Sequence, residues 1–166
     1  MSVARDLVDP TAARRGAPVK IALRDLVKIR VSTSGRRVTA IDHVSFDVGV
    51  GEFVCLLGPS GCGKTTIMNI LAGLDAPTSG QALLDGKPIS GPGPDRAVLF
   101  QEPALFPWLS VLANVQLALR FAGVPAAERR DRAMQWLDNV RLAPLADAQP
   151  HELSAGQRQR AALARA

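Results

Sequence analysis

The first third of the chain alternates between apolar and polar or small residues. Residues 19–23 and 44–48 place a large hydrophobic side chain at every second position. A period of two residues is typical of a strand with one buried face. We therefore predict two strands, separated by a turn at residues 32–37.

Two later runs are continuously apolar rather than alternating. Residues 52–57 read EFVCLL, and residues 97–100 read AVLF. Short apolar runs are typical of parallel strands that are buried on both faces, so we predict a core strand in each. A further strand is predicted at residues 82–84, because the Asp-Gly pair at 85–86 favours a hairpin turn.

The pattern then changes to helical periodicity. Residues 67–74 and 133–140 carry apolar side chains at the i, i+3, i+4 and i+7 spacing of one helix face, and residues 111–119 also fit a helix. Ser154 and Gln157 have the spacing of a capping box, which predicts a last helix. A strand-rich half is thus followed by a helical subdomain, predicted at about residues 103–152.

Composition favours a globular class and excludes few functions. The chain has 166 residues, of which 47% are apolar and 21% charged, and its net charge is +5. The arginines are scattered along the chain and are not interleaved with aromatic residues. We interpret them as solvated basic faces with some affinity for phosphate, and we expect no nucleic-acid partner.

The cysteines indicate a reducing compartment, and the hydrophobic runs bear on whether the chain spans a membrane. An extended path between Cys55 and Cys62 keeps their Cα atoms beyond disulfide range, so we expect two free thiols. No apolar run approaches the length of a membrane span, and the start of the chain lacks a signal-peptide core. Residues 1–18 are predicted to be a disordered leader, residues 19–166 the domain, and the protein to be cytosolic.

The strongest chemical signal is the run from Gly58 to Thr65, which reads GPSGCGKT. It is a complete phosphate-binding loop of the G-x-x-x-x-G-K-[ST] type, placed between a predicted strand and a predicted helix. Backbone N–H groups close around a polyphosphate, Lys64 supplies a cation, and the Thr65 hydroxyl can hold Mg²⁺. The predicted nucleotide-binding residues are Gly58, Pro59, Ser60, Gly61, Cys62, Gly63, Lys64, Thr65 and Thr66.

Residues 153–157 read LSAGQ and are followed by RQR and a small-residue helix. This segment resembles the signature of ATP-binding-cassette (ABC) ATPases, usually LSGGQ. A serine cap at a helix N-terminus also forms an anion site on physical grounds. In the family the signature closes over the γ-phosphate of ATP held by a partner subunit. The resemblance therefore implies that Ser154, Gly156 and Gln157 contact the nucleotide of a second subunit.

The same resemblance implies an α/β P-loop NTPase fold with N-terminal antiparallel strands, a RecA-like core and a helical insert. Gln101, after the predicted strand at 97–100, matches the family's Q-loop glutamine. Its implied role is to approach Mg²⁺ and the attacking water, which makes Lys64 and Gln101 the expected catalytic residues and Thr65 and Gln101 the expected metal ligands. The expected cofactors are ATP and Mg²⁺.

Other short segments of the sequence narrow the resemblance to one group within the family. The segments GPDR, FQE and LFPWLSV, with Asn114-Val115, look like the ATPase subunits of nitrate/sulfonate/taurine importers, and Trp108 is the most telling residue. The implied protein is an ATP-binding importer subunit that forms a homodimer. It contacts transmembrane permease subunits, and through them a substrate-binding protein, at the cytoplasmic face of the plasma membrane.

Three departures from the family pattern leave alternatives open. Family members continue into an apolar strand that ends in Asp-Glu, the Walker B motif, and no Asp-Glu pair occurs in these 166 residues. We therefore expect a chain truncated at its C-terminus, unstable by itself, with a non-catalytic nucleotide-binding fragment as the alternative function. Ala155 replaces the first signature glycine, and residues 28–31 lack the aromatic on which the family stacks adenine.

Two other classes are disfavoured. ABC ATPases that act on nucleic acid usually carry coiled-coil or tandem-cassette insertions, and neither is present here. A small-molecule kinase needs a lid and an acceptor site, and it leaves residues 153–157 unexplained.

Overall fold

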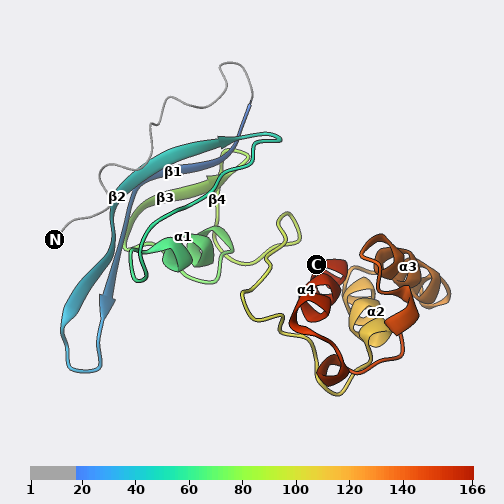
Figure 1. The fold of residues 1–166 in the computed structure, drawn as a ribbon. Helices are drawn as coiled ribbons and strands as arrows, with labels where there is room; N and C mark the ends of the chain where they lie inside the picture. Colours follow the sequence, from blue (N-terminus) through green and yellow to red (C-terminus); the bar gives the residue numbers. More distant parts are fainter. Residues whose placement is uncertain (1–17) are drawn as a thin grey trace. The chain divides into compact units, whose positions relative to one another are not determined.

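The computed structural model describes residues 18–166. The leader expected at residues 1–18 therefore lies outside the described residues, apart from Pro18. The chain divides into two compact units, of which the first ends at Arg96 and the second runs Ala97–Ala166 (Figure 1). Each unit has a hydrophobic core of its own.

Within residues 18–96 the first unit forms a four-stranded antiparallel sheet. Its strands are β1 (Val19–Val31), β2 (Arg37–Gly49), β3 (Ser79–Leu84) and β4 (Lys87–Pro88), in the spatial order β2-β1-β3-β4. β1 pairs with both β2 and β3, so the two alternating segments of the sequence form one long hairpin, as predicted.

Two tight turns connect these strands as the sequence predicts. In the β1–β2 turn, the N–H of Ser32 donates to the carbonyl oxygen of Arg36 at 2.9 Å. Between β3 and β4, Asp85 and Gly86 both adopt positive φ, at 49° and 74°. This is the backbone that a two-residue hairpin requires and that an Asp-Gly pair tolerates.

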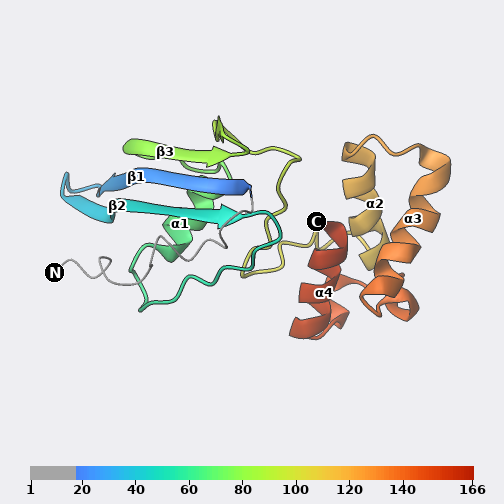
Figure 2. The same cartoon turned by 90° about the horizontal axis from the view of Figure 1, so that it is seen from above.

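The helix α1 (Lys64–Leu71) packs on one face of this sheet (Figure 2). Ile67 and Ile70 are buried, the latter to 1% exposure, against side chains of β1, β2 and β3. Burying one such side chain contributes about 1.5–3 kcal/mol. The helix that follows the phosphate-binding loop is therefore held by its apolar face, as its periodicity predicts. Its sheet partners are Leu23, Leu26, Ile41, Phe46 and Ala82.

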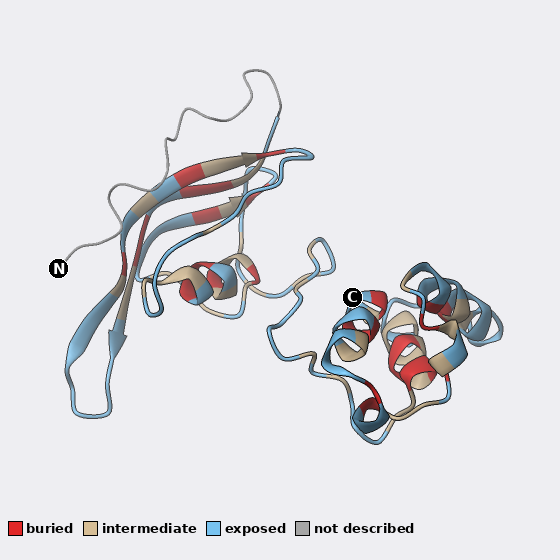
Figure 3. Cartoon of the chain, viewed as in Figure 1, coloured by how far each residue is buried: buried red, intermediate tan, exposed pale blue. Residues whose placement is uncertain are grey.

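The two core strands predicted from the apolar runs are not formed. Residues 52–59 and 97–100 have no regular structure (Figure 3). Phe53 and Leu57 are 90% and 78% exposed. The prediction was wrong because a parallel strand needs a neighbour that accepts its ladder hydrogen bonds. Within residues 18–166 no strand pairs with either run. An apolar composition does not supply that neighbour.

The second unit consists of helices packed on one core. They are α2 (Val111–Phe121), α3 (Ala126–Asn139) and α4 (Ala155–Arg165), with 3₁₀ turns at Ala143–Leu145 and Pro150–Glu152. All three helices were predicted. The unit includes α4 as well as the segment expected to form the helical subdomain, residues 103–152. Its fully buried side chains include Val111, Ala133, Leu137, Leu142 and Ala161.

A buried amide fixes the loop that precedes α2. Asn114 is 0% exposed, and its Oδ1 accepts from the N–H of Phe106 at 2.8 Å. Its Nδ2 donates to the carbonyl oxygens of Phe106, Leu109 and Ser110 at 3.0–3.2 Å. One side chain therefore bonds four backbone groups of the loop at residues 106–110, which carries Trp108 at 74% exposure.

The other end of α4 contacts the same loop. Arg165 Nη1 donates to the carbonyl oxygen of Ala104 at 2.6 Å, and its guanidinium lies 5.8 Å from the centre of the Phe106 ring. Phe106 in turn packs against Trp108, with ring centres 5.5 Å apart. Burial lowers the pKa of Arg165 from its ordinary value, but an arginine stays charged at neutral pH.

Candidate functional site

The phosphate loop, residues 58–65, joins an irregular segment to the N-terminus of α1. Gly63 caps the helix with φ 98°, and a Cβ added there would lie 2.5 Å from the carbonyl oxygen of Ala40 in β2. A Cβ on Gly58 would lie 2.7 Å from the Cys62 Sγ. Glycine is thus required at Gly63 by the close approach to backbone and by the left-handed φ, whereas the close contact at Gly58 is with the end of a side chain.

Lys64 lies over the loop that precedes it. Its Nζ donates to the carbonyl oxygens of Gly58 and Pro59, both at 2.8 Å, and lies 3.4 Å from the Cys62 Sγ. The side chain therefore places a positive charge at the mouth of the loop. The structure thus places Lys64 beside Gly58, Pro59 and Cys62 of the same loop.

The N-terminus of α1 adds further groups that favour an anion. No side chain caps this end, so the first N–H groups of the helix keep no intrahelical partner. The aligned peptide dipoles also favour negative charge there. Thr65 is exposed at this end, whereas Thr66 is buried in the core with 9% exposure. Of these two threonines, only Thr65 is open to solvent.

The signature segment lies in the second unit and has the predicted cap. The Ser154 hydroxyl accepts from the N–H of Gln157 at 3.3 Å, and the Gln157 Oε1 accepts from the N–H of Ser154 at 2.7 Å. Gly156 is exposed in the first turn of α4, and nothing lies within 4 Å of a Cβ built on it. The segment is a fully formed helix N-terminus that is open to solvent.

Gln101 follows a run that does not form a strand. It lies in an exposed bend of the second unit rather than at a strand end. The phosphate loop is in the first unit, so each unit carries its own part of the predicted site. The cysteines are free, as expected, although Cys55 is exposed and not buried in a strand. No group of three or more metal-ligating side chains was found among residues 18–166.

A cluster of charges near α1 was not predicted from the sequence. Asp75 accepts from Lys28 Nζ at 2.5 Å and from Arg30 Nη2 at 3.3 Å. The hydrogen bond from Lys28 lowers the pKa of the Asp75 carboxyl below its usual value, and the charges of Lys28 and Arg30 add to this. Asp75 is more than forty positions from both basic residues, so only the folding of β1 against the chain after α1 reveals the cluster.

Replacing Asp75 by asparagine tests this cluster. The folded-state pKa of Asp75 lies below its unfolded value, so the ionised carboxylate stabilises the folded chain at neutral pH and loses this effect as pH falls through the folded pKa. We expect Asp75→Asn to lower the free energy of unfolding at pH 7, with a difference from the wild type that shrinks as the pH falls below the ordinary aspartate pKa and through the lower folded-state pKa. Urea unfolding followed by circular dichroism measures it, with the exposed Asp131→Asn as control. A difference that does not shrink at any acid pH at which the chain is still folded would contradict the assignment.

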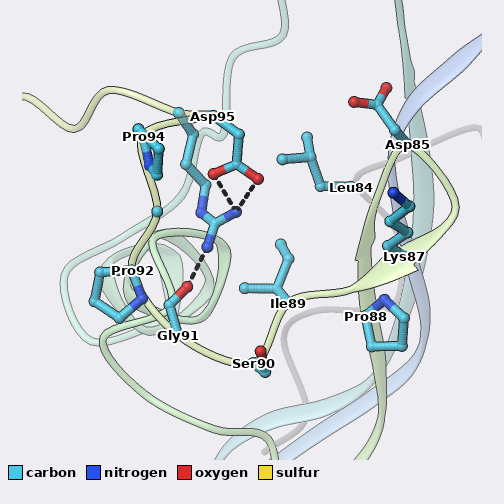
Figure 4. A pocket seen from close by; sticks show the side chains of 12 residues that line it. Leu84, Asp85, Lys87, Pro88, Ile89, Ser90, Gly91, Pro92, Pro94 and Asp95 are labelled. Carbon is cyan, nitrogen blue, oxygen red and sulfur yellow. Dashed lines mark hydrogen bonds and ion pairs between the residues drawn. The ribbon is translucent and has the colours of Figure 1, made fainter. Parts of the chain in front are cut away.

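The first unit also contains a cavity of about 530 Å³ beside the β3–β4 hairpin (Figure 4). The guanidinium of Arg96 donates to both carboxylate oxygens of Asp95 and to the carbonyl of Gly91. Asp85 at its rim is paired with Lys20 at 2.7 Å. Each of these two pairs is electrically neutral, so neither offers a free positive charge to a phosphate group.

Sequence comparison places the chain among known proteins. The profile of the family described as ABC transporter matches residues 41–166. The chain belongs to the ABC transporter family. This ABC chain is 50% identical over 139 residues to the taurine import ATP-binding protein TauB of Chromobacterium violaceum, and 43% identical over 145 residues to the nitrate import ATP-binding protein NrtD of Synechocystis sp.. The alignments cover 84% and 87% of this chain.

The same alignments cover 53% of TauB and 54% of NrtD, so the chain spans about half the length of the curated relatives it matches. These relatives confirm the resemblance to the nitrate/sulfonate/taurine importer group. No helix among residues 18–166 combines the length and the apolar character needed to cross a bilayer.

A solved structure confirms the fold class. The ATP-binding cassette MJ0796, in a dimeric post-hydrolysis state bound to ADP and Pi, matches this ABC chain with a TM-score of 0.77 and 34% identity. The match covers 87% of this chain and 68% of the other. The chain therefore has the α/β P-loop NTPase fold of ABC cassettes.

Proposed function

We propose that the chain is the ATP-binding subunit of an ABC importer for nitrate, a sulfonate, taurine or a similar small solute. The single observation that carries the proposal is the phosphate loop, in which Lys64, the first residue of α1, extends its Nζ over Gly58 and Pro59. Sequence identity to TauB and NrtD supports the transport role and the class of solute.

In this proposal the triphosphate of ATP occupies the phosphate loop. Phosphate oxygens replace the carbonyls of Gly58 and Pro59 as acceptors for Lys64 Nζ, because charged acceptors form stronger hydrogen bonds. The N–H groups at the start of α1 bind further phosphate oxygens. This part of the site lies in the first unit and binds nucleotide without help from the second.

Mg²⁺ fits this site only together with the nucleotide. Thr65 is the exposed hydroxyl beside the loop, and Mg²⁺ in nucleotide sites is held by such a hydroxyl, by phosphate oxygens and by water. Bound there, the ion neutralises phosphate charge. Gln101 is the second residue proposed to approach the ion and the attacking water.

The signature segment serves a second copy of the subunit. Ser154, Gly156 and Gln157 present a capped helix N-terminus to solvent, which suits an anion brought by another molecule. The dimeric MJ0796 cassette supports a homodimer. Permease subunits then hold the dimer at the cytoplasmic face of the membrane, and a substrate-binding protein delivers the solute to them.

A second candidate function is nucleotide binding without ATP hydrolysis by this chain alone. These 166 residues contain no Asp-Glu pair after an apolar strand. A general base contributes about 10²–10⁴-fold to a reaction rate. The purified chain is therefore expected to bind ATP with essentially no hydrolysis, and a release of phosphate that depends on Lys64 would favour the catalytic alternative.

Binding of Mg²⁺-ATP to Thr65→Ala tests the proposed site. The variant loses the hydroxyl that holds the metal ion, so we expect its affinity for Mg²⁺-ATP to fall by about tenfold. Its affinity for ATP in EDTA should be unchanged. Equilibrium dialysis with labelled ATP measures both, and Thr33→Ala in the β1–β2 turn is the control. Wild-type chain that binds no ATP under either condition would refute the proposed function.

A further inference from the structure

The segment around Gln101 has no regular structure and takes its support from α4. Residues 97–105 form neither helix nor strand, and they belong to the same unit as α4. A backbone outside helices and sheets has no repeating hydrogen bonds of its own, so its path is fixed by bonds to other elements. Two side chains of α4, Gln159 and Arg165, make such bonds here.

These two side chains bond the backbone on both sides of Gln101. Gln159 Nε2 donates to the carbonyl oxygen of Phe100 at 3.4 Å, and Arg165 Nη1 donates to that of Ala104 at 2.6 Å. The arginine bond is the stronger of the two, because its donor is charged and the distance is short. The donor and the acceptor are 59 and 61 positions apart in the sequence, so neither bond is a local feature.

A turn shortens the stretch between the two anchored positions. The N–H of Ala104 donates to the carbonyl oxygen of Glu102 at 2.8 Å across Pro103, whose ring fixes its φ. Holding Ala104 therefore holds Glu102 as well. Gln101 lies between this turn and the anchored Phe100. Its own side chain is exposed and has no hydrogen-bond partner among residues 18–166.

We propose that Gln159 and Arg165 are positioning residues for Gln101, holding its backbone in place while its amide stays free for the metal ion and the attacking water. The inference rests on the role of Gln101 in the proposed function. A group that is held in place before its ligand arrives loses less conformational freedom on binding. Loss of an anchor should therefore weaken the metal-dependent part of ATP binding, without either side chain having to contact the nucleotide.

A double-mutant cycle on the purified chain tests this role. Equilibrium dialysis gives the affinities for Mg²⁺-ATP and for ATP in EDTA of the wild type, Gln101→Ala, Arg165→Ala and the double variant. Each single variant should bind Mg²⁺-ATP about two- to tenfold more weakly, with ATP in EDTA unchanged. The double variant should bind as Gln101→Ala does, because Arg165 then has no amide left to position.

Three further variants serve as controls and alternatives. Arg130→Ala removes an exposed arginine of α3 and should bind like the wild type. Arg165→Lys keeps a charged donor and should recover part of the lost affinity. Gln159→Ala changes an exposed residue and tests the other anchor if circular dichroism shows that Arg165→Ala does not fold.

Hydrogen exchange provides a readout that needs no nucleotide. The amides of residues 101–104 should exchange faster in Arg165→Ala and in Gln159→Ala than in the wild type. Unchanged exchange in both variants would overturn the positioning role. So would equal losses of affinity with and without Mg²⁺, or losses that multiply in the double variant. Failure of the wild type to bind ATP under either condition would instead refute the proposed nucleotide site, and hydrogen exchange would still decide whether the anchors hold the segment.

Discussion

Replacement of Lys64 by alanine is expected to weaken ATP binding by on the order of a hundredfold or more. The Lys64 ammonium lies at the mouth of the phosphate loop, 2.8 Å from two of its carbonyl oxygens, where a triphosphate gathers several negative charges. Removing one partner of a hydrogen-bonded charge pair costs about 2–5 kcal/mol, and each 1.4 kcal/mol is tenfold in affinity. Equilibrium dialysis or calorimetry with Mg²⁺-ATP measures the change.

The control for this experiment is Lys87→Ala. Lys87 is an exposed lysine in the same unit, at the β3–β4 hairpin, so its loss changes the net charge equally without touching the loop. Circular dichroism establishes that both variants fold like the wild type. If Lys64→Ala and Lys87→Ala bind ATP equally well, the assignment of the loop is wrong.

Replacement of Asn114 by alanine is expected to destabilise the second unit by about 2–4 kcal/mol. The buried amide makes four hydrogen bonds to the backbone of residues 106–110. A typical hydrogen bond contributes about 0.5–1.5 kcal/mol net, and an orphaned buried donor costs about 1–3 kcal/mol. The Phe106 N–H is left without its acceptor in this variant.

Tryptophan fluorescence during urea unfolding measures this loss selectively. The chain has two tryptophans, Trp108 and Trp136, and both belong to the second unit. Asn139→Ala, at the exposed end of α3, is the matched control and should stay within about 0.5 kcal/mol of the wild type. If Asn114→Ala unfolds at the same midpoint concentration of urea as the wild type, the amide has no such structural role.

Local signals predicted most of the local structure. The alternation at residues 19–23 and 44–48, the Asp85-Gly86 turn and the periodicity of α1 and α3 each depend on residues close in sequence. The phosphate loop and the Ser154–Gln157 cap are also local, because each is a short segment with its own backbone geometry. Such features can be read directly from the order of the residues.

Features that depend on distant partners could not be predicted in this way. The apolar runs at 52–57 and 97–100 have strand composition, yet a strand forms only where another strand pairs with it. The Asp75 cluster joins residues of β1 to the chain beyond α1, and no spacing rule links them. In the sequence, Asn114 contributes only to the resemblance to importer ATPase subunits. Its burial and its bonds to residues 106–110 follow from the packing of α2.

The helix α4 has a mechanical consequence. It is continuous from the Ser154 cap to Arg165, about 16 Å at 1.5 Å per residue, and Arg165 holds Ala104 and the Phe106 ring. A hydrogen-bonded helix of this length behaves as a stiff rod. The signature end of α4 and the loop of residues 104–106 are therefore joined by one stiff element, so a force on either end is transmitted to the other.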